Sequence, residues 1–373
     1  QFSSGPCRKR PGWSAVKISE TALVGRSHRS KEAKNQLREV SRLIKDILKI
    51  PESYKVGITP ASNTGAFELA LWSFLGTEPV DVFVWESFGA GWANDIVNQL
   101  KIKDYRLIKS NYGLLPKMKA SSRRTDICFT WNGTTSGVRV PNAKWIEKDR
   151  IGLAICDATS AVFSQELDWS KLDITTFSWQ KSMGGEGAHG VLILSPKAVE
   201  RLEKSKIDRA IPKIFRLTKE GKLIDSIFSG ETINTPSMLC VADALDSLNW
   251  IEEIGGLAST IARSDKNFMA LQNWVDSEDW VENICREKSH RSNTSVCLKI
   301  VDPLFLGIPE NKKRAFVLEM VDLLENEGVA YDIAGHRDAP PGLRIWCGPT
   351  VECFDVEALL PWLTWSFGIV SAR

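Results

Sequence analysis

The 373-residue chain predicts an α/β fold, with a large domain over residues 1–256 built on a mostly parallel sheet and a smaller C-terminal α+β domain over 257–373. Apolar, strand-like runs at 81–85, 127–131, 151–156, 174–179 and 191–194 alternate with segments of helical length. That alternation is typical of parallel strands covered by helices on both faces. The residues Phe88, Thr134, Asp157 and Lys181 follow the carboxyl ends of these runs, where open α/β sheets bind ligands.

The first helix is predicted over 31–48, where apolar residues recur at helical spacing after Ser30, a candidate N-cap, and before Pro51. A strand at 56–59 then leads into the sequence PASNTG at 60–65, which opens a second helix ending near Gly76. A loop that opens into a helix N-terminus favours phosphate, because backbone N–H groups and the helix dipole both attract anions. An ordinary cap by Asn63 or Thr64 explains the same residues, and the two interpretations are compatible.

The C-terminal half begins with helices predicted over 237–254 and 257–275, the second of which leads out of the large domain. A strand at 294–301, a helix at 312–326, strands at 329–333 and 343–346, and a last helix from 355 complete the smaller domain.

Composition excludes several classes of protein. A net charge of +2 is too balanced to indicate a nucleic-acid partner. No apolar run approaches the roughly 20 residues of a membrane span, and no signal peptide is recognisable, so we expect no membrane association. The eight cysteines contain no Cys-x-x-Cys, which favours reduced thiols in a cytoplasmic protein. Cys347, Cys353 and His336 match no common zinc spacing, and we expect no metal site.

Lys181 and Asp157 carry the strongest chemical signal. Lys181 ends one apolar run and precedes a glycine-rich loop, and Asp157 ends the preceding run. A pyridoxal phosphate enzyme needs this pair, because aspartate keeps the pyridine nitrogen protonated and lysine carries the aldehyde as an imine. A strand-end aspartate and a surface lysine of an unrelated α/β protein would give the same pattern, so the pair alone leaves both interpretations open.

The sequence GEGAHG at 185–190 matches the G-x-G-x-x-G pattern of dinucleotide sites. A dinucleotide site requires a helix directly after the third glycine, whereas a strand, VLIL at 191–194, follows here. We therefore predict no dinucleotide site, and expect the next helix to begin with Ser195 as N-cap and Pro196 at its first position.

Further motifs extend over nearly the whole chain: FSSGP at 2–6, SHR at 27–29, WQKSMGGEGAHG at 179–190, NTP at 234–236, and His336-Arg337 followed by Arg344. In this order they resemble the phosphoserine aminotransferases, a class-V family of pyridoxal phosphate enzymes with fold type I. The glycine-rich sequence after Lys181 is similar to that of a divergent branch of the family.

The resemblance implies a role for each matching residue. Lys181 and Asp157 would be catalytic, and Arg344 would hold the substrate α-carboxylate. Phe88 would stack on the pyridine ring, where the better-known bacterial members have tryptophan. Those members also have a glycine-rich phosphate loop with an arginine, whereas this chain has Ala61 to Gly65. The implied cofactor ligands are Asn63, Thr64, Phe88, Thr134, Asp157, Gln180, Lys181 and, from the neighbouring subunit of a homodimer, Asn234 and Thr235; the implied substrate ligands are His28, Arg29, His336, Arg337 and Arg344.

The activity implied by the resemblance is transamination between L-glutamate and 3-phosphohydroxypyruvate, which gives 2-oxoglutarate and O-phospho-L-serine. Two alternatives stay open. Another class-V enzyme, of the alanine– or serine–glyoxylate type, would show no preference for a phosphorylated substrate. A non-catalytic pyridoxal-phosphate-binding or interaction protein would show no turnover.

Overall fold

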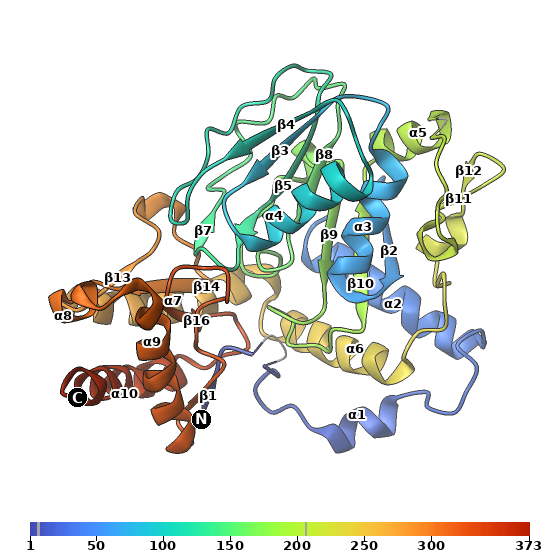
Figure 1. Cartoon of the computed structure of the whole chain (residues 1–373). Coiled ribbons are helices and arrows are strands. Elements are labelled where there is room, and N and C mark those ends of the chain that lie inside the picture. The colour runs from blue at the N-terminus through green and yellow to red at the C-terminus, as the bar shows by residue number, and fades with distance from the viewer. Residues whose placement is uncertain (6–7, 206) are drawn as a thin grey trace.

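The computed structural model describes residues 1–5, 8–205 and 207–373. Pro6 of the N-terminal motif and Cys7 lie outside the described residues. The centre of the molecule is a seven-stranded sheet in the order β2-β10-β9-β8-β5-β3-β4 (Figure 1). Only β10 runs antiparallel to its neighbours in this sheet, which confirms the predicted mostly parallel arrangement. The strands are β2 (Lys55–Pro60), β3 (Val80–Val84), β4 (Tyr105–Lys109), β5 (Asp126–Thr130), β8 (Ala154–Asp157), β9 (Ile174–Ser178) and β10 (His189–Leu194).

Helices bury both faces of this sheet. On β10, Val191 and Ile193 pack into a core shared with α2 (Lys31–Ile47) and α6 (Met238–Glu253). Leu192 and Leu194 point to the opposite core, shared with α3 (Ser62–Phe74), α4 (Ser87–Asn94) and α5 (Pro196–Lys204). Burial of one such aliphatic side chain contributes about 1.5–3 kcal/mol, so a charge in the middle of either face would break the sheet.

Two helix starts follow the predicted capping. The hydroxyl of Ser30 accepts a hydrogen bond from the backbone N–H of Ala33 at 3.2 Å, and that of Ser195 accepts one from Ala198 at 3.1 Å, with Pro196 in the first turn of α5. Strand β10 begins at His189, within the last residues of the glycine-rich sequence GEGAHG. A strand, and no helix, therefore follows this sequence, as predicted.

Several helices and strands of the structure were not predicted from the sequence. Helix α4 and the π-helical turn after it (Asp95–Gln99) come from a short, glycine-containing segment without helical periodicity. Strand β4 is a polar edge strand. The remaining short elements include α1 (Ala15–Thr21), β6 (Asn132–Gly133), β7 (Val138–Arg139), β11 (Thr218–Lys219), β12 (Lys222–Leu223) and α8 (Pro303–Gly307).

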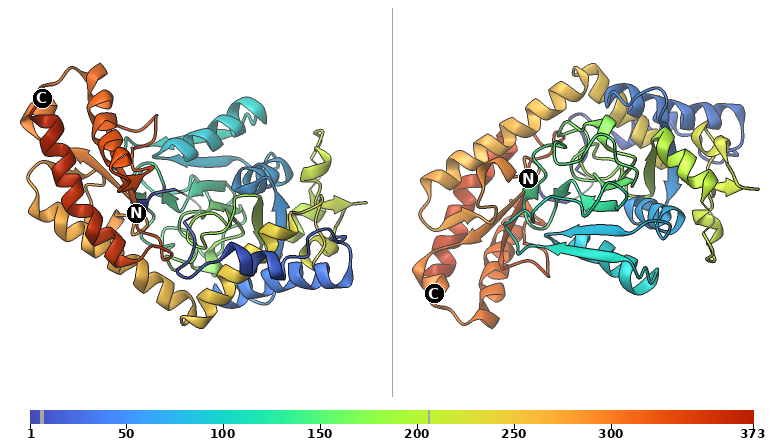
Figure 2. Two further views of the ribbon diagram at one scale, coloured as in Figure 1. Left: turned by 90° about the horizontal axis from the view of Figure 1, so that it is seen from below. Right: turned by 90° about the horizontal axis from the view of Figure 1, so that it is seen from above.

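Helix α7 (Gly256–Ser277) connects the large sheet to a second core, and Figure 2 shows it in gold and orange along one side of the molecule. That core contains a three-stranded antiparallel sheet of β13 (Val281–Asn283), β14 (Ser295–Ile300) and β16 (Gly342–Trp346), together with α9 (Glu310–Asn326) and α10 (Cys353–Ser371). Strand β1 (Phe2–Ser3) pairs in parallel with β15 (Ala330–Tyr331), so the first residues lie with the C-terminal elements. A boundary between residues 256 and 257 stays a prediction.

Helix α10 was not recognised from sequence as an unusually apolar segment. Among the described residues it is the one helix long and apolar enough, by length and composition, to cross a membrane, and 28% of its apolar window is buried. The core helices of soluble proteins meet the same criterion. Here Val356, Leu359 and Leu363 face the second core, and α10 packs against α7 and α9.

The N-terminal segment fastens these parts together. Lys9 forms ion pairs with Glu186, in the loop after Lys181, at 2.7 Å and with Asp243 of α6 at 2.9 Å. One residue earlier, Arg8 pairs with Asp355 of α10 at 2.7 Å. Two adjacent basic residues therefore join the glycine-rich loop, helix α6 and the C-terminal helix α10.

Candidate active site

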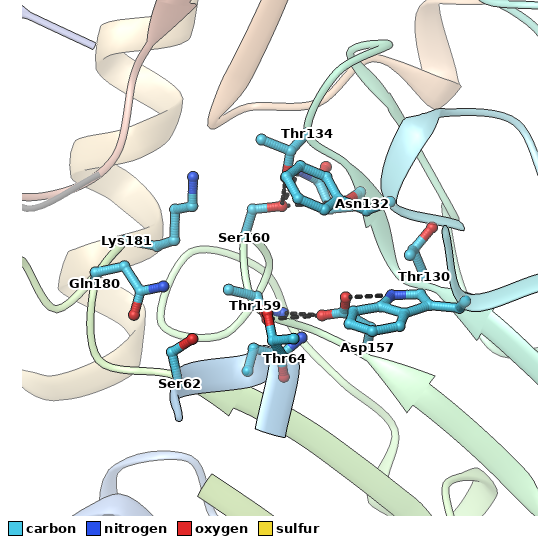
Figure 3. Close-up of a pocket in the computed structure, with 13 residues that line it drawn as sticks. Ser62, Thr64, Thr130, Asn132, Thr134, Asp157, Thr159, Ser160, Gln180 and Lys181 are labelled. Atoms are coloured by element: carbon cyan, nitrogen blue, oxygen red, sulfur yellow. Dashed lines mark hydrogen bonds between the residues drawn. The ribbon is translucent and has the colours of Figure 1, made fainter. Parts of the chain in front are cut away.

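A cavity of about 250 Å³ lies at the carboxyl ends of the parallel strands (Figure 3). Seven predicted cofactor ligands line it: Asn63, Thr64, Phe88, Thr134, Asp157, Gln180 and Lys181. Six further lining residues were not predicted: Ser62, Trp92, Thr130, Asn132, Thr159 and Ser160. Residues that are more than 100 positions apart in sequence thus meet where parallel strands end together.

Asp157 ends β8 and is almost fully buried, with 7% of its surface exposed. Its Oδ1 accepts hydrogen bonds from the N–H of Thr159 at 3.0 Å and from the Thr159 hydroxyl at 2.7 Å, and its Oδ2 accepts one from Trp92 Nε1 at 3.0 Å. Burial raises the pKa of Asp157, whereas the hydrogen bonds from Thr159, Trp92 and Asn63 lower it. The carboxylate is therefore buried but supplied with donors, which suits it to face a cationic group.

Lys181 follows β9, the strand that pairs in parallel with β8. Its Nζ lies 5.6 Å from the ring centroid of Trp346 on β16. Arg344 is two residues before Trp346, so both side chains leave the same face of β16. Ser4 holds this strand in place, because its hydroxyl donates to the carbonyl of Arg344 at 2.8 Å and accepts from the N–H of Trp346 at 3.0 Å.

Beside the cavity, Phe88 of α4 lies close to His336, which precedes β16. The rings of Phe88 and His336 lie with their centroids 5.9 Å apart. Burial lowers the pKa of His336, with Arg344 and Arg337 also opposing its charge and Asp338 favouring it. Cys297, opposite Arg344 in the β14–β16 pair, lies 3.6 Å from the carbonyl of Thr134. His336 and Arg344 therefore lie next to residues that line the cavity, although neither lines it, and their role as substrate ligands stays a prediction.

The turn that opens α3 is conformationally unusual. Ala61 and Ser62 adopt left-handed backbone conformations, with φ values of 62° and 52°, although neither is glycine. Such conformations cost free energy and occur preferentially at functional sites. Gly190 makes this turn possible, since a Cβ there would collide with the carbonyl oxygen of Ser62. The first turn of α3 thus presents Ser62, Asn63 and Thr64 to the cavity.

The polar groups of the cavity fit pyridoxal phosphate. Lys181 supplies an amine, Asp157 a buried carboxylate, Phe88 an aromatic ring, and the α3 N-terminus donors for a phosphate. Gln180 Oε1 and Asn63 Oδ1 are buried without a hydrogen-bond partner among the described residues, so a ligand has polar groups to contact.

Four other predicted residues form a separate group. His28, Arg29, Asn234 and Thr235 line a second cavity of about 270 Å³, and none of them lines the Lys181 cavity. The predicted ligand Arg337 is in neither of these cavities; its side chain is 86% exposed and lies 3.9 Å from Asp338. Within a single chain, the predicted ligands therefore do not all line the cavity that contains Lys181.

His189 stabilises the segment beside the second cavity. Its Nε2 accepts a hydrogen bond from the N–H of Ser237, the N-cap of α6, at 3.1 Å, directly after the Asn234-Thr235-Pro236 sequence. Burial lowers the pKa of His189 to about 4, so the ring is neutral near pH 7 and able to accept this bond. The sequence had indicated His189 only as part of the glycine-rich loop.

Several of the residues missed from sequence had a usable signal. Thr159 and Ser160 come two and three residues after Asp157, and Asn132 directly follows the predicted strand run at 127–131. Ser160 accepts hydrogen bonds from Thr134 at 2.8 Å and from Asn132 at 2.9 Å, which fixes Thr134 in the cavity wall. Trp92 had no such signal, because α4 itself was not predicted. Within the described ranges, no cluster of three or more histidine, cysteine, aspartate or glutamate residues could hold a metal ion.

The fold and the arrangement of Lys181 and Asp157 are those of a pyridoxal-phosphate-type transferase. The chain belongs to the class-V aminotransferase family, whose model matches residues 17–341. Within this family, the chain is 51% identical over 369 residues to the phosphoserine aminotransferase of Methanosarcina mazei, an alignment that covers 99% of this chain and 97% of that protein. The resemblance inferred from the sequence motifs is therefore confirmed.

Solved structures confirm fold type I. The PLP-bound phosphoserine aminotransferase of Trichomonas vaginalis superposes with a TM-score of 0.78 and 18% identity, covering 97% of this chain and 99% of that one. The alanine–glyoxylate aminotransferase of Nostoc sp. gives 0.78 and 16% identity, covering 98% and 95%. Because both enzyme types share the fold at low identity, the fold does not determine the substrate.

Proposed function

We propose that the protein is a pyridoxal-phosphate-dependent phosphoserine transaminase. It would exchange an amino group between L-glutamate and 3-phosphohydroxypyruvate, giving 2-oxoglutarate and O-phospho-L-serine. The observation that carries this proposal is that Asp157 and Lys181, at the ends of the adjacent parallel strands β8 and β9, line one cavity. The 51% identity to a phosphoserine aminotransferase over almost the whole chain supports this substrate over glyoxylate.

The proposed cofactor contacts follow from the positions of the side chains. Pyridoxal phosphate supplies an aldehyde that takes up an amino group and a pyridinium ring that withdraws electrons. Lys181 would hold the aldehyde carbon, Asp157 the ring nitrogen and Phe88 one face of the ring. Ser62 and Thr64 on the first turn of α3 would hold the phosphate, with Thr134 and Gln180 beside the ring.

Lys181 has a second task in this proposal. Once the substrate amine replaces it, the Lys181 Nζ would take the proton from the substrate α-carbon and return it, as general base and then general acid. The Asp157 carboxylate would keep the ring nitrogen protonated throughout. Phe88 and His336, whose ring centroids are 5.9 Å apart, would limit the access of water.

Substrate recognition would depend on anion-binding side chains. Arg344 would bind the α-carboxylate common to all substrates, because a guanidinium pairs with both carboxylate oxygens. His336 and Arg337 would reach the distal phosphate or γ-carboxylate from the small domain. His28 and Arg29 would reach it from a second subunit, since they do not line the Lys181 cavity of their own chain.

A homodimer with shared active sites is the proposed assembly. Its support is that Asn234 and Thr235 line the same cavity as His28 and Arg29, away from Lys181 of the same chain. This cavity would contribute phosphate donors and cations to the neighbouring subunit. We also infer a reducing, cytoplasmic environment, in agreement with seven free cysteines among the described residues.

Subunit mixing tests the sharing. A Lys181→Ala chain mixed with an Asn234→Ala/Thr235→Ala chain should regain activity, because each hybrid dimer contains one intact site. The matched control mixes Lys181→Ala with Asp157→Ala, which lie in one cavity of one chain, and should regain nothing. Equal behaviour of the two mixtures, with subunit exchange proven by native mass spectrometry, would exclude shared sites.

Separate half-reactions test the substrate. Glutamate added to the cofactor-loaded enzyme should change its absorbance, and 3-phosphohydroxypyruvate should restore it faster than glyoxylate does. A preference for glyoxylate would favour the alternative enzyme type. No change with any amino donor would favour a non-catalytic binding protein. Borohydride reduction followed by peptide mass spectrometry should place the cofactor on Lys181.

A further inference from the structure

Helix α4 brings two aromatic residues to the cavity, one turn apart. Phe88 and Trp92 are four residues apart in the helix, so their side chains leave the same face. Trp92 is only 8% exposed, and its ring packs on Phe67 of α3 with centroids 4.6 Å apart. Its Nε1 donates to Asp157 Oδ2 at 3.0 Å, the hydrogen bond drawn at Asp157 in Figure 3.

The start of this helix is held by a buried carboxylate. Glu86, the N-cap of α4, is 3% exposed and accepts a hydrogen bond from the N–H of Gly89 at 2.6 Å. It also accepts from the hydroxyl of Thr135 at 2.9 Å, and Thr135 in turn accepts from the N–H of Ser87 at 3.1 Å. These bonds fix α4 relative to the loop after β5, so the indole of Trp92 has one defined position.

The indole N–H acts only as a donor, whereas a protonated carboxyl group presents a donor of its own. A buried N–H directed at Oδ2 therefore favours the ionised form of Asp157 and fixes the plane of its carboxylate. The hydrogen bonds from Thr159 end on Oδ1, so they do not replace this contact. In the proposed enzyme, the orientation of this carboxylate determines how well it faces the ring nitrogen of the cofactor.

We infer that Trp92 is a positioning residue that holds Asp157 ionised and directed toward the ring nitrogen of pyridoxal phosphate. The inference rests on the proposed function, since it assumes that cofactor. Trp92 would thereby help to keep the ring nitrogen of the cofactor protonated. Its contact with Phe67 alone would make Trp92 an ordinary core aromatic residue.

The test compares two cofactors by their equilibrium binding, without any turnover. Pyridoxal phosphate has the ring nitrogen, and its 1-deaza analogue has carbon there. The unmodified protein should bind pyridoxal phosphate more tightly. Trp92→Phe should reduce this preference roughly tenfold, the effect of losing one hydrogen bond to a charged group, while binding of the 1-deaza analogue changes little. Trp169→Phe is the matched control, because Trp169 is similarly buried and donates to the neutral carbonyl of Leu48 at 2.8 Å.

A second variant separates the hydrogen bond from packing. Replacing Trp92 with 3-benzothienylalanine keeps the shape of the indole and removes only the N–H, so it should reproduce the loss of preference even if Trp92→Phe folds poorly. Equal weakening for both cofactors, or an unchanged preference in the isosteric variant, would overturn the inference. A lack of preference in the unmodified protein would instead refute the proposed role of Asp157 and the cofactor assignment itself.

Discussion

The ring centroid of Phe88 lies 5.9 Å from that of the His336 imidazole, so a residue that lines the Lys181 cavity is close to one that belongs to the C-terminal part of the chain. Phe88 belongs to α4, and His336 precedes β16, which carries Arg344 and Trp346. The proposed site, with Arg344 as a substrate ligand, is therefore complete only when the two parts of the chain are packed together. A small rotation between them would change the distance of Arg344 from Lys181 without altering either part internally.

Arg344→Ala should weaken all substrates alike. Every substrate of the proposed reaction has an α-carboxylate, so loss of its guanidinium partner should lower kcat/KM for both glutamate and phosphoserine. The loss of one charge-assisted bond, about 1.5–3 kcal/mol, corresponds to roughly tenfold to a hundredfold. Steady-state kinetics with both substrates measures this. A loss for one substrate only would show that Arg344 contacts the distal anion instead.

Arg29→Ala and Arg337→Ala should affect phosphoserine more than glutamate, because a phosphate presents more charge and more acceptor oxygens than a γ-carboxylate. The ratio of the two kcat/KM values is the measurement. Arg124→Ala serves as a control for loss of one positive charge, because this exposed side chain pairs with Glu78 and lines neither of the two cavities. If phosphoserine turnover were unaffected in Arg29→Ala and Arg337→Ala, the proposed phosphate site would be wrong and the glyoxylate type would be favoured.

Gly190→Ala should weaken cofactor binding by displacing the turn at Ser62. The added methyl group would meet the Ser62 carbonyl and the side chain of Ala66, so the first turn of α3 must move. Fluorescence titration with pyridoxal phosphate should give a higher Kd. The control is Gly368→Ala in α10, where a methyl group meets no atom within 4 Å and helix propensity predicts a gain of about 0.5–1 kcal/mol. Equal affinity in Gly190→Ala would show that the turn tolerates displacement.

His189 should make the protein less stable in mild acid. Its folded-state pKa of about 4 is below the ordinary value, so the unfolded chain takes up a proton first as the pH falls. This contribution is complete above about pH 6.5 and is lost toward pH 4, by about 2 kcal/mol between pH 7 and pH 5. Urea unfolding at these two pH values should show a smaller difference for His189→Gln than for the unmodified chain. An identical difference would place the acid sensitivity elsewhere.

The sequence predicted those parts of the site that depend on local patterns. Asp157 and Lys181 each end an apolar run, and parallel strands bring such ends together, so their meeting could be predicted. Helix α4 could not, because its short segment has no apolar periodicity and its N-cap, Glu86, is held by Thr135 from the loop after β5. Trp92 was missed for that reason. Asn63 was predicted from the phosphate loop, and in the structure its side chain also forms a hydrogen bond with Asp157.

The grouping of residues that are far apart in sequence could not be predicted from sequence patterns either. His28 and Arg29 meet Asn234 and Thr235 across about two hundred residues, and no spacing rule relates the two pairs. Their motifs suggested ligands, but not that the four would share a cavity separate from that of Lys181. The packing of α2 against α6, the helices that flank these segments, brings them together, and Lys34 of α2 adds an ion pair with Glu231 at 2.6 Å.

The pairing of β1 with β15 has a consequence for how the molecule is made. Phe2 is synthesised well before its strand partner Ala330, which follows 328 positions later (330 − 2). The hydrogen-bond partners of Ser4, Arg344 and Trp346, follow at even larger sequence separations of 340 and 342 residues. The N-terminal residues therefore remain unplaced while the rest of the chain leaves the ribosome, and closing so large a loop is slow. Catalytic competence should consequently appear after the bulk of the secondary structure during refolding, because the strand that carries Arg344 is held by Ser4, which is 340 positions away in sequence.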